Sequence, residues 1–228
     1  MRLFDPELAL RAWWPLVYEG LVATIPLTLF SFGAGFVLAI FVALAKLSRN
    51  RVVYCIGAAF VSAIRGTPLL VQLYLPFYAL PMITGTMVPP LLSAWIALTL
   101  NVAGYAGESI RGAILAVPKG QWEAAQSVGM GFALTLRRIV LPQALRIGIP
   151  PLSNTFISLV KDTSLVSIVM VTEIMRQAQI IATPTYQFTT VYIVAAVIYW
   201  LICTPLSFGQ RRLEQFLART SPVAVGGT

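Results

Sequence analysis

Charged residues divide the chain into long apolar runs. Three runs contain no Asp, Glu, Lys or Arg: residues 20–45, 66–107 and 177–210. A membrane-spanning helix needs about 20 mainly apolar residues. The middle run is long enough for two spans, and Pro81, Gly85, Pro89 and Pro90 mark a turn between them. The pattern therefore predicts helices that cross a membrane.

The region after Arg146 is less regular. Residues 147–160 carry no charge, Lys161 and Asp162 interrupt the run, and a second apolar run follows over 165–172. We interpret this region as one span broken at the charged pair. Only thirteen residues separate Arg51 from Arg65, which favours a helix lying at the interface over another crossing. The prediction is five spans: about 20–45, 66–86, 89–108, 147–171 and 188–209.

Composition supports this membrane class independently. The chain has 58% hydrophobic residues, 11% charged residues and a mean hydropathy of +0.82. A soluble core of 228 residues could not bury so much apolar surface. We expect an all-α membrane protein in which residues 1–228 form a single transmembrane domain.

Lys and Arg residues predict the orientation, because basic residues are retained on the cytoplasmic side. With five spans, alternate loops share a side, and the count is twelve against four. The larger set is Lys46, Arg49, Arg51, Arg65, Arg111, Lys119, Arg137, Arg138, Arg146, Arg211, Arg212 and Arg219; the smaller is Arg2, Arg11, Lys161 and Arg176. This places the amino terminus outside, and the carboxyl terminus and a loop over about 111–146 in the cytoplasm. The net charge of +8 then reflects topology, and no basic stripe with interleaved aromatics suggests a nucleic-acid partner.

Several kinds of chemistry are excluded by residue type. The chain has no His, which removes Ser/His catalysis and His-based zinc sites, and it has no Cys cluster or carboxylate pair for another metal. Cys55 and Cys203 are expected to be buried free thiols. No Gly-rich loop ending in Lys-Ser/Thr is present, so any ATP site would lie on another chain. We expect no cofactor on this chain.

Lys161 and Asp162 are the notable charges inside a predicted span, where ionisable groups are costly and usually functional. Adjacent charges of opposite sign could read a zwitterion, with Thr163 and Ser164 beside them. The alternatives are an ion pair that stabilises the helix break, or a shallow, hydrated position. Lys161 is also three residues from Ser158 and Ser164, which leaves open a Ser/Lys hydrolase.

Asn101, Tyr105 and Glu108 follow one another at intervals of four and three, so they share one face of the third span. Glu108 is expected to pair with Arg111 or Arg65. Asn101 and Tyr105 lie deeper and could line a cavity that faces a substrate side chain, although hydrogen bonding between helices is the alternative.

The loop over 111–146 contains a spaced motif: Glu123, Ala124, Ala125, Gly129, Ile139, Leu141 and Pro142. This motif resembles the EAA loop of the membrane subunits of bacterial ABC importers. The resemblance implies a short cytoplasmic coupling helix that fits a cleft on an ATP-hydrolysing subunit. Glu123, Ala124, Ala125 and Gly129 would then be the coupling residues.

The resemblance extends to two further segments. Residues 65–70 (RGTPLL) and 158–165 (SLVKDTSL) are similar to elements of the polar amino acid permease family, which includes histidine, glutamine, arginine and cystine systems. Residues 119–122 (KGQW), 150–154 (PPLSN) and 176–179 (RQAQ) are most similar to the cystine-type permeases.

The family implies a type I importer fold, made of helices only. It also implies the partners: a second permease, either a copy or a paralogue, two ATPase subunits that bind ATP and Mg²⁺, and an extracytoplasmic solute-binding protein. The implied location is a bacterial inner membrane. A self-sufficient secondary transporter or channel remains the main alternative, because such a protein would also use intramembrane charges.

Overall fold

The computed structural model describes residues 4–219, with side chains through residue 217, and every regular element in this range is a helix. In chain order they are α1 (Pro6–Glu19), η1 (Gly20–Thr24), α2 (Ile25–Leu47), α3 (Arg51–Gly66), α4 (Leu69–Tyr74), η2 (Leu75–Ala79), α5 (Leu80–Thr84), α6 (Pro90–Leu115), α7 (Lys119–Ser127), α8 (Phe132–Thr135), η3 (Leu136–Val140), α9 (Leu141–Asp162), η4 (Thr163–Val169), α10 (Ile174–Thr185) and α11 (Phe188–Arg219). Elements η1 to η3 are π-helical turns and η4 is a 3₁₀ helix. The predicted all-α class is confirmed for the described residues, whereas Arg2 lies outside them.

The first long helix joins α1, η1 and α2 into one run of 42 residues, Pro6–Leu47. Asp5 begins it, since its side chain accepts hydrogen bonds from the backbone N–H groups of Glu7 (3.0 Å) and Leu8 (3.2 Å). The widened turn η1 ends two residues before Pro26, which has no N–H to donate to the preceding turn. The span expected over 20–45 covers η1 and nearly all of α2.

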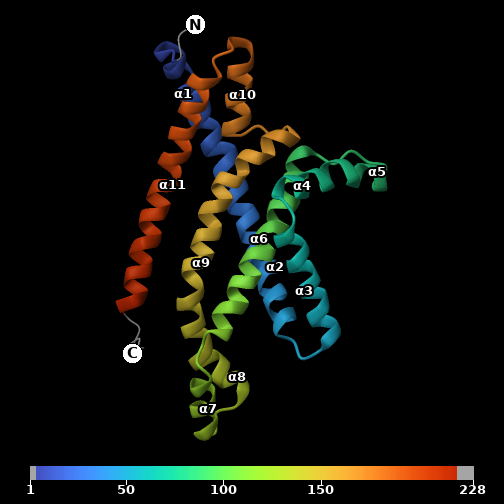
Figure 1. Ribbon diagram of the computed structural model, residues 1–228, viewed down its shortest axis with the longest axis vertical. Helices are drawn as coiled ribbons and strands as arrows, with labels where there is room; N and C mark the ends of the chain where they lie inside the picture. Colours follow the sequence, from blue (N-terminus) through green and yellow to red (C-terminus); the bar gives the residue numbers. More distant parts are fainter. Residues whose placement is uncertain (1–3, 220–228) are drawn as a thin grey trace.

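The second predicted span differs most from the structure. Residues 51–65, expected to lie at the interface, form α3, which packs against α2 and α6 (Figure 1). The segment expected to cross, 66–86, instead forms a helix over Leu69–Thr84 that leaves α3 at 109°. The reason is Thr67-Pro68: the residue before a proline is pushed into extended backbone, which ends α3.

By length and composition, the described residues contain two helices able to cross a membrane, Pro6–Leu47 and Phe188–Leu217, or up to four if two bent pairs each count as one span. The second bent pair joins Phe132–Val169 to Ile174–Thr185 at 49°. The break predicted at Lys161–Asp162 coincides with the change from α9 to the 3₁₀ helix η4, and the bend follows Val169. Helix α6 has 26 residues but carries Asn101 and Glu108 in its interior.

The core lies where α2, α6 and α9 pack together. Helices α2 and α6 approach closely at Gly35, where a Cβ atom would stand 2.6 Å from Cβ of Val102. Small residues at such contacts let two backbones approach, which is a common way to pack helices in lipid. Buried core residues include Ala39, Leu98, Val102, Ala106 and Leu159. A second cluster joins α1, α10 and α11 around Leu16, Ile174, Ala178 and Val191.

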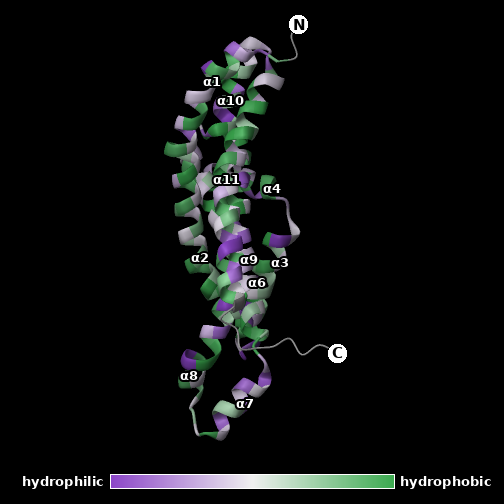
Figure 2. Cartoon of the chain, turned by 90° about the vertical axis from the view of Figure 1, so that its left-hand side faces the viewer, coloured by the Kyte–Doolittle hydropathy of each residue, from purple (hydrophilic) through white to green (hydrophobic). Residues whose placement is uncertain are grey.

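The outer surface of the bundle is apolar. Figure 2 shows hydrophobic residues along most of the long helices and a more mixed pattern in α7 and α8. Large exposed apolar side chains include Phe30 on α2 and Trp200 on α11. An apolar exterior of this extent is typical of a protein surrounded by lipid.

The ends of the bundle differ in what they contain. Figure 1 shows α7, α8 and the turn between α2 and α3 toward one end, and the amino terminus with α10 at the other. Most of the basic residues predicted to be cytoplasmic therefore lie toward the α7 end. Arg65 is an exception, because it ends α3 and so lies a helix length away from Arg51.

Candidate functional site

The coupling segment, defined as residues 117–144, forms a helical hairpin that extends beyond the α6 and α9 ends (Figure 1). Helix α7 holds the predicted residues Glu123, Ala124 and Ala125. Ala125 is buried, whereas Glu123 and Ala124 are exposed. Val117, Val140 and Ala144 form the small buried cluster beneath the hairpin, with Ile114, Trp122 and Leu136 packed against it.

Gly129 ends helix α7 with a left-handed backbone. Its φ is +78°, its N–H donates to the carbonyl of Gln126 (2.9 Å), and the N–H of Met130 donates to the carbonyl of Ala125 (3.0 Å). This pair of bonds is the Schellman ending of a helix, in which glycine is favoured because it has no Cβ. No heavy atom of the described chain lies within 4 Å of where its Cβ would be, so backbone angle and not crowding requires glycine.

The outer face of the coupling segment combines apolar and polar groups. Trp122 stacks on Phe132 with ring centroids 5.7 Å apart, which holds α7 against α8. Val128 and Phe132 are nevertheless 75% and 71% exposed. Glu123 adds a negative charge to the same exposed segment. Such a face is suited to docking on another protein.

A polar cavity of about 480 Å³ lies between α6, α9 and the start of α4. It is within the roughly 300–1,000 Å³ typical of small-molecule sites. Its lining residues are Thr67, Pro68, Leu69, Asn101, Val102, Tyr105, Asn154, Thr155, Ser158, Leu159 and Asp162. Three predicted site residues, Asn101, Tyr105 and Asp162, thus come together from two helices.

The other predicted residues are not among those that line the cavity. Lys161 is exposed, since neighbouring positions on a helix point about 100° apart. Thr163 is buried and donates its hydroxyl to the carbonyl of Val160 (2.7 Å), and Ser164 is half-buried. No ion pair joins Lys161 to Asp162 within the described part of the chain. Nor does a hydrogen bond between described side chains join Lys161 to Ser158 or Ser164, as a Ser/Lys hydrolase would require.

Gln72 was not predicted from the sequence, yet it holds the bend between α3 and α4. Its Nε2 donates to the carbonyls of Ile64 (2.7 Å) and Thr67 (3.1 Å) and to the Thr67 hydroxyl (3.0 Å). Carbonyls at the end of a helix lack a partner within the helix, and Gln72 supplies one. Its Oε1 accepts a hydrogen bond from Nδ2 of Asn101 (2.9 Å). Asn101 therefore lines the cavity and also forms a hydrogen bond between helices, so the two interpretations that the sequence left open are both true of this residue.

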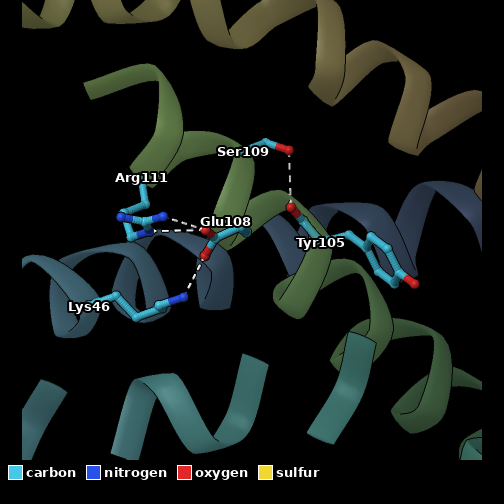
Figure 3. Close-up of polar contacts among 5 residues, drawn as sticks. All are labelled: Lys46, Tyr105, Glu108, Ser109 and Arg111. Atoms are coloured by element: carbon cyan, nitrogen blue, oxygen red, sulfur yellow. Dashed lines mark hydrogen bonds and ion pairs between the residues drawn. The ribbon is translucent and has the colours of Figure 1, made fainter. Parts of the chain in front are cut away.

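Glu108 lies one turn below the cavity, at the centre of an ionic cluster (Figure 3). One carboxylate oxygen accepts from Nη2 (2.5 Å) and Nε (3.1 Å) of Arg111, and the other accepts from Nζ of Lys46 (2.6 Å). The predicted pairing with Arg111 is confirmed, and Lys46 is an additional partner. Arg65 does not join this cluster; its guanidinium carbon lies 5.5 Å from the ring centroid of Tyr105.

Glu173 is a further residue that was not identified from the sequence. Glu173 is fully buried, accepts a hydrogen bond from the Tyr199 hydroxyl (2.5 Å), and caps α10 by accepting from the N–H of Arg176 (2.9 Å). The sequence signal was weak, because a cap needs only one acidic residue before a helix. Its contacts indicate a structural role at the joint between η4 and α10.

Both cysteines are free, as expected, but the predicted burial is wrong. Cys55 is exposed and Cys203 is partly buried. Apolar neighbours in the sequence do not distinguish a side chain facing the core from one facing the outer, apolar surface.

A larger hollow of about 1000 Å³ lies between α2, the start of α6 and residues 170–172. Its lining is almost wholly apolar, including Leu27, Phe30, Leu91 and Trp95. It offers no charged group, so the smaller cavity at Asp162 is the better candidate for a polar ligand.

Comparison with known proteins agrees with this arrangement. Residues 35–219 match the family described as the binding-protein-dependent transport system inner membrane component. The L-cystine transport system permease protein TcyB of Bacillus subtilis (strain 168) is 50% identical over 218 residues, covering 93% of each chain. The nopaline transport system permease protein NocM of Agrobacterium fabrum (strain C58 / ATCC 33970) is 37% identical over 233 residues, covering 98% of this chain and 96% of that one.

Solved structures show the same fold. In a crystal structure of an amino acid ABC transporter with histidines, the matching chain is 36% identical, with a TM-score of 0.83 over 88% of this chain and 94% of that one. A chain of the inward-facing MetNI methionine ABC transporter has a TM-score of 0.75 at 23% identity, covering 90% and 97%. The resemblance to amino acid ABC permeases, drawn from the EAA segment and residues 65–70 and 158–165, is therefore confirmed. This chain belongs to the family of binding-protein-dependent transport system inner membrane components.

Proposed function

We propose that this protein is the membrane-spanning permease of an ATP-driven amino acid importer and that its substrate is L-cystine or a closely similar polar amino acid. The observation that carries the importer function is the coupling segment, which places Glu123 and Ala124 on an exposed, Schellman-capped helix beyond the end of the bundle. A self-sufficient transporter would have no need for such a protruding hairpin.

The polar cavity supports an amino acid as the substrate. Asp162 supplies a carboxylate for a substrate ammonium group, while the hydroxyl and amide groups of Thr67, Asn154 and Ser158 offer hydrogen bonds. Cystine is favoured within this class because the TcyB relative, at 50% identity, is described as an L-cystine permease. Three residues next to Asp162 were also expected to bind the charged groups of an amino acid. They do not line the cavity, so in this proposal they act only indirectly; they are Lys161, Thr163 and Ser164.

The proposed assembly combines the orientation predicted from the basic residues with the partners that the family implies. We place the amino terminus outside and the coupling segment inside, with five crossings, of which the second is the bent pair formed by α3 and Leu69–Thr84. Two permeases, each a copy or a paralogue, would pair in a bacterial inner membrane. Two ATPase subunits would bind ATP and Mg²⁺ and press on the coupling segments, and an extracytoplasmic binding protein would deliver the amino acid.

The geometry suggests how force could reach the cavity. The coupling segment connects α6 directly to α9, and these two helices supply Asn101, Tyr105 and Asp162. A movement of the hairpin would therefore shift both walls of the cavity together. Alternating access to the cavity would follow from that movement.

Reconstitution tests this proposal. The permease and its ATPase, co-purified and placed in proteoliposomes, should take up radiolabelled L-cystine only when ATP and the binding protein are both supplied. Uptake by the permease alone, driven by an ion gradient, would instead support a secondary transporter. Failure of the chain to co-purify with any ATPase would reject the importer.

A further inference from the structure

Gln72 controls which atom of Asn101 faces the cavity. Gln72 is a buried residue, with only 7% of its surface exposed. Its nitrogen lies against two backbone carbonyl oxygens, those of Ile64 (2.7 Å) and Thr67 (3.1 Å). Only an NH₂ group can bond to two carbonyl oxygens, so the orientation of the Gln72 amide is fixed.

The fixed orientation passes to Asn101. With both N–H groups of Gln72 engaged, its Oε1 can only accept, and the group that donates to it is Nδ2 of Asn101 at 2.9 Å. Asn101 therefore turns its nitrogen toward Gln72 and its Oδ1 away. Oδ1 makes no hydrogen bond within the described residues, and Asn101 lines the polar cavity. The cavity thus gains a carbonyl acceptor in addition to the carboxylate of Asp162.

We infer that Gln72 is a positioning residue that makes the cavity selective for the ammonium group of its ligand; this rests on the proposed transport of an amino acid through the cavity. An ammonium group has three donors and no acceptor, which matches an oxygen of Asn101 together with Asp162. If Asn101 were free to rotate, it would present its NH₂ part of the time and repel that group. Gln72 acts through Asn101, because it is not among the residues that line the cavity.

The test measures binding to the permease–ATPase complex in nanodiscs, without the binding protein. Radiolabelled L-cystine is displaced by cystamine, which keeps the two ammonium groups, or by 3,3′-dithiodipropionate, which keeps the two carboxylates. In Gln72→Met, we expect the Kd for cystamine to rise about tenfold, the scale of one hydrogen bond to a charged group. The Kd for 3,3′-dithiodipropionate should not rise.

A rescue variant separates positioning from a merely structural effect. Asn101→Asp carries oxygen at both ends of its side chain, so its rotation no longer matters. Gln72→Met combined with Asn101→Asp should therefore recover most of the affinity for cystamine, although the bend between α3 and α4 stays unsupported. Absence of recovery, or an equal loss of affinity for both analogues in Gln72→Met, would overturn the inference.

Two further variants decide the matter if Gln72→Met does not assemble. Asn101→Asp and Asn101→Leu both keep the Gln72 side chain and its backbone acceptors at Ile64 and Thr67, although neither can donate to Oε1 of Gln72 as Asn101 does. The first should bind cystamine at least as well as the wild type, and the second about tenfold more weakly. Equal affinities would contradict the role of Asn101. A wild-type complex that binds cystamine here but shows no ATP-dependent uptake would instead contradict the proposed function.

Discussion

The coupling segment and the polar cavity are built in opposite ways. The hairpin is made by residues close in sequence: Trp122 stacks on Phe132, and Gly129 and Met130 bond back to α7. The cavity gathers Thr67, Asn101 and Asp162 from three distant parts of the chain. A surface made by local contacts can be recognised as a sequence motif, whereas a site made by long-range packing depends on the whole fold. The kind of protein that docks on the coupling segment is therefore easier to predict than the ligand of the cavity.

The largest expected effect concerns which side of the membrane the coupling segment and the opposite end of the bundle face. In a variant with Cys55 and Cys203 replaced by Ser, a single Thr86→Cys should react in intact cells with an impermeant thiol reagent, because Thr86 is exposed near the end of α5, away from α7. Ser127→Cys, also exposed, should react only after the membrane is opened. The opposite pattern of labelling would invert the proposed topology.

The sequence was most informative where local chemistry decides the structure. Residues 123–129 identified the exposed helix, and the alternation of charged and apolar runs gave the all-α membrane class. The bend after α3 could not be predicted as such, since Thr67-Pro68 also suits the start of a straight span. For the same reason Arg65 was counted together with Arg51, although the two residues lie at opposite ends of α3.

A second prediction distinguishes Asp162 from Lys161, which the sequence analysis assigned to the same site. Asp162 lines the cavity and Lys161 does not. Asp162→Asn keeps the shape but removes the charge, so uptake by the reconstituted complex should fall to background while nucleotide binding persists. Lys161→Met should retain most of the uptake. If Lys161→Met is as inactive as Asp162→Asn, both charged side chains are needed to bind the amino acid, although only Asp162 lines the cavity.

The residues that sequence reasoning missed share one property. Gln72 and Glu173 are buried polar side chains whose partners are remote: Asn101 for the first and Tyr199 for the second. A buried polar group must find hydrogen-bond partners, but the sequence does not say which ones. Asn101 itself was found, because its spacing from Tyr105 and Glu108 marks a helix face, yet its role required the structure.

A third prediction tests whether the coupling segment depends on local backbone geometry. Gly129→Val places a β-branched residue at φ +78°, which costs about 1–2 kcal/mol and should distort the exposed end of α7. We expect a several-fold loss of binding-protein-stimulated ATPase activity with normal membrane insertion. Gly131→Val is the matched control, because Gly131 has φ −68° and also has open space around it. Equal activities of the two variants would show that the Schellman ending does not matter for coupling.

The smallest expected effect on transport lies at the point where the coupling segment and the cavity meet. Glu108 stands on α6 between Tyr105 of the cavity and the start of the coupling segment, and it joins Lys46 to Arg111 (Figure 3). These three side chains are only 13–27% exposed, so Glu108→Gln leaves two partly buried cations with a weaker partner. We expect a loss of about 1–3 kcal/mol in stability, measured as a lower midpoint of thermal unfolding of the complex in detergent.

Ser109→Ala is the control for this change, since the Ser109 hydroxyl donates only to the carbonyl of Tyr105 (3.0 Å) on the same helix, and its midpoint should remain near that of the wild type. Uptake per assembled complex should also be nearly unchanged in Glu108→Gln, because its carboxylate contacts neither the cavity nor α7. A variant that keeps its midpoint but loses uptake would contradict this expectation, and would show that the ionic cluster itself helps to transmit movement from the coupling segment to the cavity.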